Sequence, residues 1–476
     1  MPTSKKTKIV ATLGPACSTR EVLKKMIDAG VNVFRINFSH ADYEDVKARV
    51  EMIRSLNEEF GYSTGILADL QGPKLRVGVM KEDVVVHPGD LITFTTAEDI
   101  PGTADKVYMN YKEFPKDVNP GERILLDDGK LIFEAVETNR STEVVARVIQ
   151  GGPLKSKKGV NLPNTKVSLP ALTKKDIKDA LFAIKLGVDW IALSFVRTPK
   201  DLEELQDLIG KNADHKIPII AKIEKPEAIE NIDKIVAFCD GLMVARGDLG
   251  VELPAHEVPL IQKKLVNRAK TARIPVIIAT QMMETMITSL TPTRAEVNDV
   301  ANSVMDGADA VMLSGETSVG NYPVQVIEKM TQIILAVEDS PLIQVPQNTP
   351  QVRTKRFITK SICHHAAMMA NVIKAKAICT LTNSGYTAFQ ISAWRPQSHI
   401  LVFTSNRRIL TQLSLLWGVK SFYYDKFVST DDTVVDVNNI AKDHHFVQKG
   451  DMLINLAAMP VTDKGMVNTL RVSEIE

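Results

Sequence analysis

The stretch that decides the fold runs from Ile219 to Ile232 and reads IIAKIEKPEAIENI. Its apolar first half favours a buried strand, and the Lys-Pro step that follows favours a turn into a helix. Lys222 and Glu224 stand two residues apart on the strand, so their side chains point to the same face. The stretch therefore predicts a β/α unit that carries a cation and a potential metal ligand in one site.

Further apolar runs of this kind alternate with helix-period segments along the chain. Such alternation is typical of a parallel sheet covered by helices, and eight β/α units fit a (β/α)8 TIM barrel, an α/β fold. The active site of such a barrel lies at the carboxyl ends of its strands. The eight predicted strands are residues 8–13, 33–38, 65–70, 189–195, 218–224, 241–246, 275–281 and 309–314.

A different pattern interrupts the barrel between Leu70 and the helix that starts near Thr173. Segments such as RILLDDGKLIFEAVE alternate in polarity, contain turn residues and lack a helical period. Because so long an insertion without structure is uncommon in a compact domain, we expect an inserted all-β domain here, a β-barrel lid that closes over the site.

The sequence changes character again after Asp339. SPLIQVPQNTPQVR, residues 340–353, indicates a linker, and a smaller alternation of strands and helices follows it. The predicted domains are residues 1–71 and 169–340 for the two parts of the TIM barrel, 72–168 for the lid, and 341–476 for a C-terminal α/β domain.

Composition narrows the class of protein. The chain has 476 residues, 44% of them hydrophobic, which is enough for several domains of roughly 100–200 residues each. Its net charge of +1 gives no reason to expect nucleic acid or an anionic membrane as a partner. Four cysteines without CxxC spacing, and no apolar run of the ~18–20 residues that a membrane span needs, favour a soluble, cytoplasmic protein.

Charged and polar side chains follow five of the predicted strands. Any one of them is equally well explained by a helix cap or a surface ion pair, but agreement among five strand ends favours one common site at the barrel top. These ends are Arg35–His40, Asp69–Arg76, Lys222 with Glu224, Arg246–Asp248 and Thr280–Glu284.

This set of residues is suited to a phosphorylated acid. Arginine binds phosphate through two parallel hydrogen bonds, and lysine supplies a compact positive charge. Two carboxylates provide oxygen ligands for Mg2+ or Mn2+ and leave coordination positions for a substrate. Neither GxxxxGK[ST] nor GxGxxG is present, so a nucleotide would bind without those loops.

Six longer stretches closely resemble pyruvate kinases, and the resemblance runs over the whole chain. They are VFRINFSH (33–40), KKGVNLP (157–163), IIAKIEKPEAI (219–229), MVARGDLGVELP (243–254), PVIIATQMMETM (275–286) and PTRAEVNDVANSVMDGADAVMLSGETSVGNYP (292–323). The resemblance implies transfer of a phosphoryl group from phosphoenolpyruvate to ADP, giving pyruvate and ATP in the last step of glycolysis. It also implies a homotetramer with an effector domain at the C-terminus.

The resemblance assigns a role to each residue of the barrel mouth. Lys222 matches the lysine that neutralises the transferring phosphoryl group, and Thr280 matches the threonine beside the enolate carbon. The divalent metal, Mg2+ or Mn2+, would be held by Glu224 and Asp248. The full implied set is Lys222, Thr280, Arg35 and Arg76 for catalysis; Arg35, Lys222, Ala245, Arg246, Gly247, Asp248 and Thr280 for substrate; and Asn37, Arg76 and Lys158 for the nucleotide.

Three neighbouring residues have two readings. Asp128 is either a hairpin-turn residue or, by resemblance, a lid residue that approaches the site on closure. Ser314 and Glu316 are either acid/base groups, by resemblance, or part of a helix-capping pattern.

The monovalent-cation pocket of the family is altered in this sequence. Asn37, Ser39 and Asp69 match three ligands of K+, but Leu70 replaces a threonine and Lys74 a glutamate. A tethered ammonium group takes the place of a monovalent cation and repels a second one at close range. We therefore predict that K+, a cofactor of many pyruvate kinases, is dispensable here.

An effector site is expected in the C-terminal domain. The loop Thr382, Asn383, Ser384, Gly385 and Thr387 follows a strand and opens a helix, and it either cradles a phosphate or forms an ordinary turn with a helix cap. By resemblance the effector is a sugar phosphate or a nucleotide, although residues 459–465 lack the basic and aromatic residues of fructose bisphosphate sites.

Two rival functions stay open at this point. A metabolite sensor would keep the scaffold without the chemistry, and another phosphoenolpyruvate-using TIM barrel, a lyase or aldolase, would not need the lid or Lys158. Turnover that depends on ADP separates both from a kinase.

Overall fold

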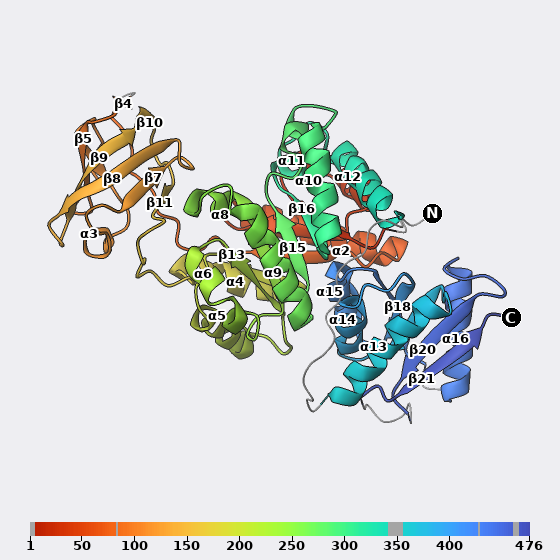
Figure 1. Ribbon diagram of the computed structural model, residues 1–476. Helices are drawn as coiled ribbons and strands as arrows, with labels where there is room; N and C mark the ends of the chain where they lie inside the picture. Colours follow the sequence, from red (N-terminus) through yellow and green to blue (C-terminus); the bar gives the residue numbers. More distant parts are fainter. Residues whose placement is uncertain (1–4, 82–83, 341–355, 427–428, 460–465) are drawn as a thin grey trace.

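The computed structural model describes residues 5–81, 84–340, 356–426, 429–459 and 466–476 (Figure 1). Within them, eight parallel strands close into a barrel in the order β1-β16-β15-β14-β13-β12-β3-β2. These strands are β1 (Lys8–Thr12), β2 (Val33–Asn37), β3 (Gly65–Asp69), β12 (Trp190–Leu193), β13 (Ile219–Ile223), β14 (Gly241–Ala245), β15 (Val276–Ala279) and β16 (Ala310–Leu313). The predicted TIM barrel is confirmed, and each expected strand has its counterpart.

Helices surround the barrel, and local signals set where several of them begin and end. Thr173 and Thr293 cap their helices reciprocally with Asp176 and Glu296. The helices of this layer are α1 (Arg20–Ala29), α2 (Tyr43–Phe60), α4 (Lys174–Leu186), α5 (Pro199–Asn212), α6 (Pro226–Glu230), α7 (Ile232–Ile235), α8 (Arg246–Glu252), α9 (Val258–Ala272), α10 (Arg294–Asp306), α11 (Gly315–Ser318) and α12 (Pro323–Glu338), with short 3-10 turns η1 (Pro15–Cys17) and η2 (Glu284–Ile287).

The insertion after β3 forms a separate β-rich body at one end of the barrel, drawn in orange in Figure 1. Its described strands form a six-stranded sheet, β11-β7-β8-β9-β5-β6, and a two-stranded sheet, β10-β4, and it includes one helical turn, α3 (Phe114–Asp117). Its strands are β4 (Val84–Val86), β5 (Leu91–Thr95), β6 (Lys106–Tyr108), β7 (Arg123–Leu126), β8 (Leu131–Thr138), β9 (Glu143–Gln150), β10 (Gly152–Leu154) and β11 (Val160–Asn161). A cluster of buried apolar side chains gives this body its own core.

The C-terminal domain is an α/β unit on the opposite side of the barrel, drawn in blue (Figure 1). Its sheet has the order β19-β18-β17-β20-β21 over the described residues, with β21 antiparallel to β20. Its elements are α13 (Phe357–Val372), β17 (Ala377–Leu381), α14 (Tyr386–Ser392), β18 (His399–Thr404), α15 (Arg407–Gln412), η3 (Leu413–Leu415), β19 (Val419–Tyr423), α16 (Thr430–Asp443), β20 (Met452–Ala457) and β21 (Thr469–Glu474). Residues 341–353 of the expected linker and residues 460–465 lie outside the described part of the chain.

Buried polar contacts join the C-terminal domain to the amino ends of the barrel strands. Arg395 forms an ion pair of 2.8 Å between its Nη2 and Oδ2 of Asp309, and both side chains are almost fully buried. The indole N–H of Trp190 donates to the Gln412 carbonyl at 3.1 Å, and the Lys8 ammonium donates to the Val419 carbonyl at 2.8 Å. These contacts fix the domain against the floor of the barrel.

The barrel interior changes from apolar at the floor to ionic at the mouth. A buried cluster that includes Leu67, Ala192 and Ile220 fills the lower interior. Because every second residue of a strand faces inward, two steps further along these strands place Asp69, Ser194 and Lys222 above that cluster. The strand period therefore delivers polar groups to the carboxyl ends of the strands, where the site forms.

Candidate active site

Lys222 is the centre of the site. Its ammonium nitrogen lies 2.6 Å from Oγ of Ser194, 2.9 Å from Oε1 of Glu224 and 3.2 Å from Oδ1 of Asp69. The side chain is 11% exposed, so the ammonium group faces a confined space shared by β3, β12 and β13. One cation thus holds two carboxylates and a hydroxyl at the barrel mouth.

The surrounding carboxylates keep Lys222 charged. Burial opposes the charge, but Asp69 and Glu224 outweigh burial and raise the pKa of Lys222 above its usual range. Burial also opposes the charge on Asp69, and Lys222 and Arg35 outweigh it, so the pKa of Asp69 is lowered. The pair is therefore ionised at neutral pH.

Arg35 lies on the other side of Asp69. Its Nε is 2.6 Å from Oδ2 of Asp69, and its Nη1 donates to Oγ1 of Thr12 at 3.1 Å. Asp69 is 1% exposed and lies between the two cations. Arg35 and Lys222 therefore share Asp69 as a partner.

Glu224 has the environment of a carboxylate prepared for a cation. Burial raises its pKa, Lys222 lowers it, and the nearby charge of Asp248 raises it again. Its Oε2 accepts a hydrogen bond of 2.7 Å from the backbone N–H of Phe195. The net effect is a raised pKa for Glu224. Its free lone pairs and the neighbouring Asp248 give the site the hard oxygen donors that suit a divalent cation.

The turn from β14 into α8 lies against the end of β15. The backbone N–H of Gly247 donates to Oγ1 of Thr280 at 2.7 Å, and the Thr280 hydroxyl donates to the Ala279 carbonyl at 2.6 Å. A Cβ atom at Gly247 would lie 3.3 Å from that hydroxyl oxygen, so glycine permits the close approach. Ala245, Gly247 and Thr280 are therefore brought together, with Asp248 in the first turn of α8.

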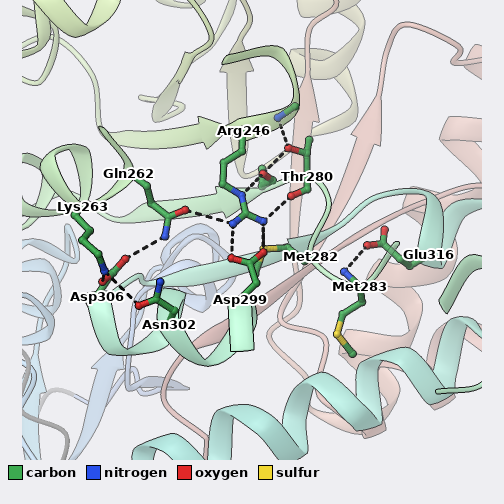
Figure 2. Close-up of polar contacts among 12 residues, drawn as sticks. Arg246, Gln262, Lys263, Thr280, Met282, Met283, Asp299, Asn302, Asp306 and Glu316 are labelled. Carbon is green, nitrogen blue, oxygen red and sulfur yellow. Dashed lines mark hydrogen bonds and ion pairs between the residues drawn. The ribbon is translucent and has the colours of Figure 1, made fainter. Parts of the chain in front are cut away.

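The side chain of Arg246 extends toward the end of β15 and α10, as Figure 2 shows. Its guanidinium group binds both carboxylate oxygens of Asp299 on α10, at 2.6 and 2.7 Å. Only the backbone of Arg246 is left to face a substrate.

The altered monovalent-cation pocket lies beside the same carboxylates. The Asn37 side-chain oxygen accepts the N–H of Ser39 at 3.1 Å, and Leu70 is fully buried. Burial and the neighbouring Arg76 lower the pKa of Lys74, whereas Asp248 and Asp128 raise it. Lys74 therefore interacts electrostatically with a carboxylate of the barrel, Asp248, and with one of the lid, Asp128.

The lid residues of the site are paired within the lid. The ammonium group of Lys158 lies 2.8 Å from Oδ1 of Asp127, and Nη1 of Arg76 donates to the Lys157 carbonyl at 3.3 Å. Asp127 and Asp128 both have positive φ, 51° and 58°, as a tight hairpin turn requires. The structure places these groups together in the lid rather than in contact with Lys222.

Glu316 and the C-terminal loop have local partners. Both Glu316 oxygens accept backbone N–H groups, from Ser314 at 2.7 Å and from Met283 at 3.1 Å, whereas the Ser314 side chain makes no capping hydrogen bond to α11. In the loop, the Thr382 hydroxyl accepts the N–H of Gly385 at 3.0 Å. Thr387 is buried, and its hydroxyl oxygen accepts from Oγ1 of Thr380.

Sequence reasoning missed the end of β12. Ser194 accepts from Lys222 and donates to the Leu70 carbonyl at 2.7 Å, while Phe195 holds Glu224 through its backbone. The available signal was a serine at the end of an otherwise apolar strand. Since Ser194 carries no charge, it did not stand out beside the other strand ends.

The fold and the site together define a TIM-barrel phosphotransferase, a kinase. The family described as "Pyruvate kinase, barrel domain" matches residues 4–327, and "Pyruvate kinase, alpha/beta domain" matches residues 360–473. The chain belongs to the pyruvate kinase family.

Relatives and a solved structure agree with this assignment over nearly the whole chain. The pyruvate kinase of Corynebacterium glutamicum is 43% identical over 98% of this chain and 97% of its own. A pyruvate kinase of Mycobacterium tuberculosis (strain H37Rv) is 42% identical, with 98% of each covered. The crystal structure of a pyruvate kinase from Cryptosporidium parvum has a TM-score of 0.92 at 32% identity, covering 100% of this chain and 97% of that one. Among the described residues, none of the helices has the length and hydropathy to cross a bilayer.

Proposed function

We propose that this chain transfers the phosphoryl group of phosphoenolpyruvate to ADP, giving pyruvate and ATP, at the site built around Lys222. The observation that carries the proposal is the position of the Lys222 ammonium, within 3.2 Å of Asp69, Glu224 and Ser194 at the barrel mouth. Phosphoryl transfer depends on positioning and on neutralising charge over the equatorial oxygens, and a buried ammonium whose pKa is raised by Asp69 and Glu224 supplies that neutralisation.

Arg35 and Arg76 are proposed to hold the phosphoryl group from two sides. Arg35 is oriented by Asp69 at 2.6 Å, so its remaining N–H groups are directed by a fixed partner. Arg76 lies in the segment that leads into the lid and pairs with Gly159. One arginine belongs to the barrel and one to the lid, so closure of the lid would bring the second charge to the reacting group.

Glu224 and Asp248 are proposed to hold Mg2+ or Mn2+. The oxygen donors of the site fit such an ion, and two protein carboxylates leave positions for phosphate oxygens. When bound, the ion neutralises charge on the phosphate oxygens. The part played by the chain is to orient Glu224 through the Phe195 N–H and the Lys222 ammonium.

The start of α8 is proposed to receive the substrate carboxylate. Backbone N–H groups at a helix start attract anions, and Gly247 leaves its amide accessible without a side chain. In this structure that N–H donates to Thr280, so the Thr280 hydroxyl holds the place that a carboxylate oxygen would take. Thr280 is then proposed to direct a proton, through water, to the enolate carbon.

The nucleotide is proposed to bind between the barrel and the lid, to Asn37, Arg76 and Lys158. The Lys158 ammonium is paired with Asp127, and 34% of the Lys158 side chain is exposed. An ADP phosphate would therefore replace Asp127 as the anionic partner of Lys158. Asp128, beside it in the hairpin, would approach the site when the lid closes.

Other properties implied by the family are also proposals for this chain. We propose a cytoplasmic homotetramer whose domains follow the boundaries expected above. The loop from Thr382 to Thr387 is proposed as the place where a sugar phosphate or nucleotide effector binds. K+ is proposed to be dispensable because Leu70 and Lys74 replace two residues of the family's cation pocket, and the Lys74 ammonium lies within the electrostatic influence of Asp248 and Asp128 at the same mouth.

One assay tests the proposed reaction. The full chain is incubated with phosphoenolpyruvate, ADP and MgCl2, and pyruvate is measured through a coupled dehydrogenase. Formation of pyruvate that requires ADP supports the proposal. Formation without ADP would indicate a lyase or a phosphatase, and a lack of turnover with retained binding of phosphoenolpyruvate would indicate a sensor; either result would overturn it.

A further inference from the structure

The turn that carries Thr280 has an unfavourable backbone. Thr280 and Gln281 are consecutive non-glycine residues with φ of 69° and 55°, in the left-handed region that L-residues with a side chain rarely occupy. Thr280 is also β-branched, which adds to the strain. Such a conformation persists only where its surroundings hold it in place.

Arg246 is the group that holds this turn. Its Nη2 donates to the Thr280 carbonyl at 2.8 Å, and its Nε donates to the Ala279 carbonyl at 3.4 Å. The guanidinium group thus binds two consecutive carbonyl groups at the end of β15. The Ala279 carbonyl comes immediately before the left-handed turn, and the Thr280 carbonyl lies within it. Figure 2 shows Arg246 and Thr280 facing each other in this arrangement.

Asp299 fixes Arg246 in turn. Its two carboxylate oxygens accept from Nη1 and Nη2 at 2.6 and 2.7 Å, the parallel geometry that orients a guanidinium plane most strongly. Asp299 lies on α10, a helix of the outer layer, and its side chain is 30% exposed. A helix outside the barrel therefore controls a turn at the barrel mouth.

We propose that Arg246 and Asp299 are positioning residues that hold Thr280 at the angle required for protonation of the enolate. The inference rests on the proposed function. In that step a lone pair of the enolate oxygen forms the C2=O bond, the electron pair of the C2–C3 double bond takes a proton from a water held by the Thr280 hydroxyl to form the new C3–H bond, and the hydroxide left behind is reprotonated by solvent. Neither Arg246 nor Asp299 donates this proton.

The role predicts a split between binding and proton transfer. The substrate phosphate is held by Lys222 and Arg35, which lie on other strands and do not touch Arg246. Loss of the Asp299 charge should therefore leave phosphate binding in place and misdirect Thr280. A misplacement of about 1 Å in a catalytic group costs on the order of 10²-fold in rate.

The test uses full-length Asp299→Asn and Asp299→Glu. Exchange of the C3 protons of pyruvate in D2O, with ATP and MgCl2 present, is followed by NMR as a measure of the proton step alone. We expect Asp299→Asn to slow this exchange on the order of 10²-fold while the KM for phosphoenolpyruvate changes by less than about threefold. Asp299→Glu keeps the charge, and we expect its exchange to be at least tenfold faster than that of Asp299→Asn.

Asp306→Asn is the matched control. Asp306 also lies on α10 and also binds a cation, Lys263 (Figure 2). It does not contact Arg246 directly: Gln262 lies between them, donating to Oδ2 of Asp306 at 3.1 Å and accepting from Nη1 of Arg246 at 3.4 Å, so the loss of the Asp306 charge should leave the ion pair of Arg246 with Asp299 in place. We expect Asp306→Asn to exchange the C3 protons of pyruvate at the rate of the unaltered chain. If Asp299→Asn exchanges protons as fast as Asp306→Asn, or if Asp299→Glu is as slow as Asp299→Asn, the proposed role is wrong.

The proposed reaction and the positioning role fail in different ways. An unaltered chain without ADP-dependent turnover would overturn the reaction itself. Should Asp299→Asn not fold, Arg246→Lys replaces it, since lysine keeps the charge but cannot hold two carbonyls and a carboxylate in one plane. Exchange at the unaltered rate in Arg246→Lys would overturn the positioning role.

Discussion

Lys222 and Glu224 lie two residues apart on one strand, and their side chains meet at 2.9 Å over the barrel mouth. Lys225, the next residue, points elsewhere and pairs with Glu252 at 2.6 Å. Both lysines are 9% exposed and both bind a buried carboxylate, so the chain contains an active-site lysine and a structural one side by side.

These two lysines provide the sharpest test of the active site. Removing one partner of a buried ion pair destabilises a protein by about 3–5 kcal/mol, so Lys222→Gln and Lys225→Gln should lower the free energy of unfolding similarly. Only Lys222→Gln should lower kcat, by about 10²–10³-fold, because only Lys222 neutralises the reacting phosphoryl group. Denaturant titration and steady-state kinetics on both variants check this, and an equal loss of kcat in the two would count against the assignment.

Metal binding should depend on Glu224. Glu224→Gln removes one anionic ligand and should weaken binding of Mn2+ to the free enzyme by roughly 10–100-fold, a typical effect of disturbing a metal site. Electron paramagnetic resonance of Mn2+ measures this binding without turnover. Glu227→Gln, on α6 one turn further along, should bind Mn2+ as the unaltered chain does.

Lys74 should determine the response to K+. With Lys74 present, adding K+ to buffer free of sodium and potassium should change kcat by less than about twofold, since an ammonium group repels a second cation at close range. Lys74→Glu combined with Leu70→Thr should become activated by K+. A large activation of the unaltered chain would refute the prediction.

Lys8 should give the stability of the protein a marked dependence on alkaline pH. Burial, followed by the charge of Lys420, lowers the pKa of Lys8 to about 7 from an ordinary 10.5. Between these values the unfolded chain binds one proton more than the folded chain, so the free energy of unfolding rises with pH by up to about 1.4 kcal/mol per pH unit from this group.

Replacing Lys8 should remove that contribution. In Lys8→Met the free energy of unfolding should rise less steeply between pH 7 and 10 than in the unaltered chain, as measured by urea titration at each pH. Lys25→Met, which changes a lysine that is 60% exposed, should leave the slope unchanged. Equal slopes in all three proteins would show that Lys8 titrates normally.

The strands of the barrel could be predicted because each carries its own signal. Buried parallel strands are short, apolar and regularly spaced, and inward-facing residues follow a period of two, which is how Lys222 and Glu224 were placed together. The charged strand ends also carried local information, because an ionisable group at the end of an apolar run has few structural explanations.

Contacts made across the fold could not be predicted in this way. Ser194 meets Lys222 only because β12 pairs with β13, and Asp299 reaches Arg246 across 53 positions of the chain. In both cases the partner is set by strand order and helix packing, and neither residue differs locally from a serine or aspartate on any surface. The outward direction of the Arg246 side chain was unexpected for the same reason.

The ion pair between Arg395 and Asp309 determines how far the chain can be divided. A barrel cut off before α13 would leave Asp309 without its arginine and would expose Trp190 and the apolar floor around it to water. An isolated buried carboxylate and an uncovered apolar patch both favour aggregation. The barrel is therefore not a portable module, because its floor is completed by side chains of the C-terminal domain beneath it.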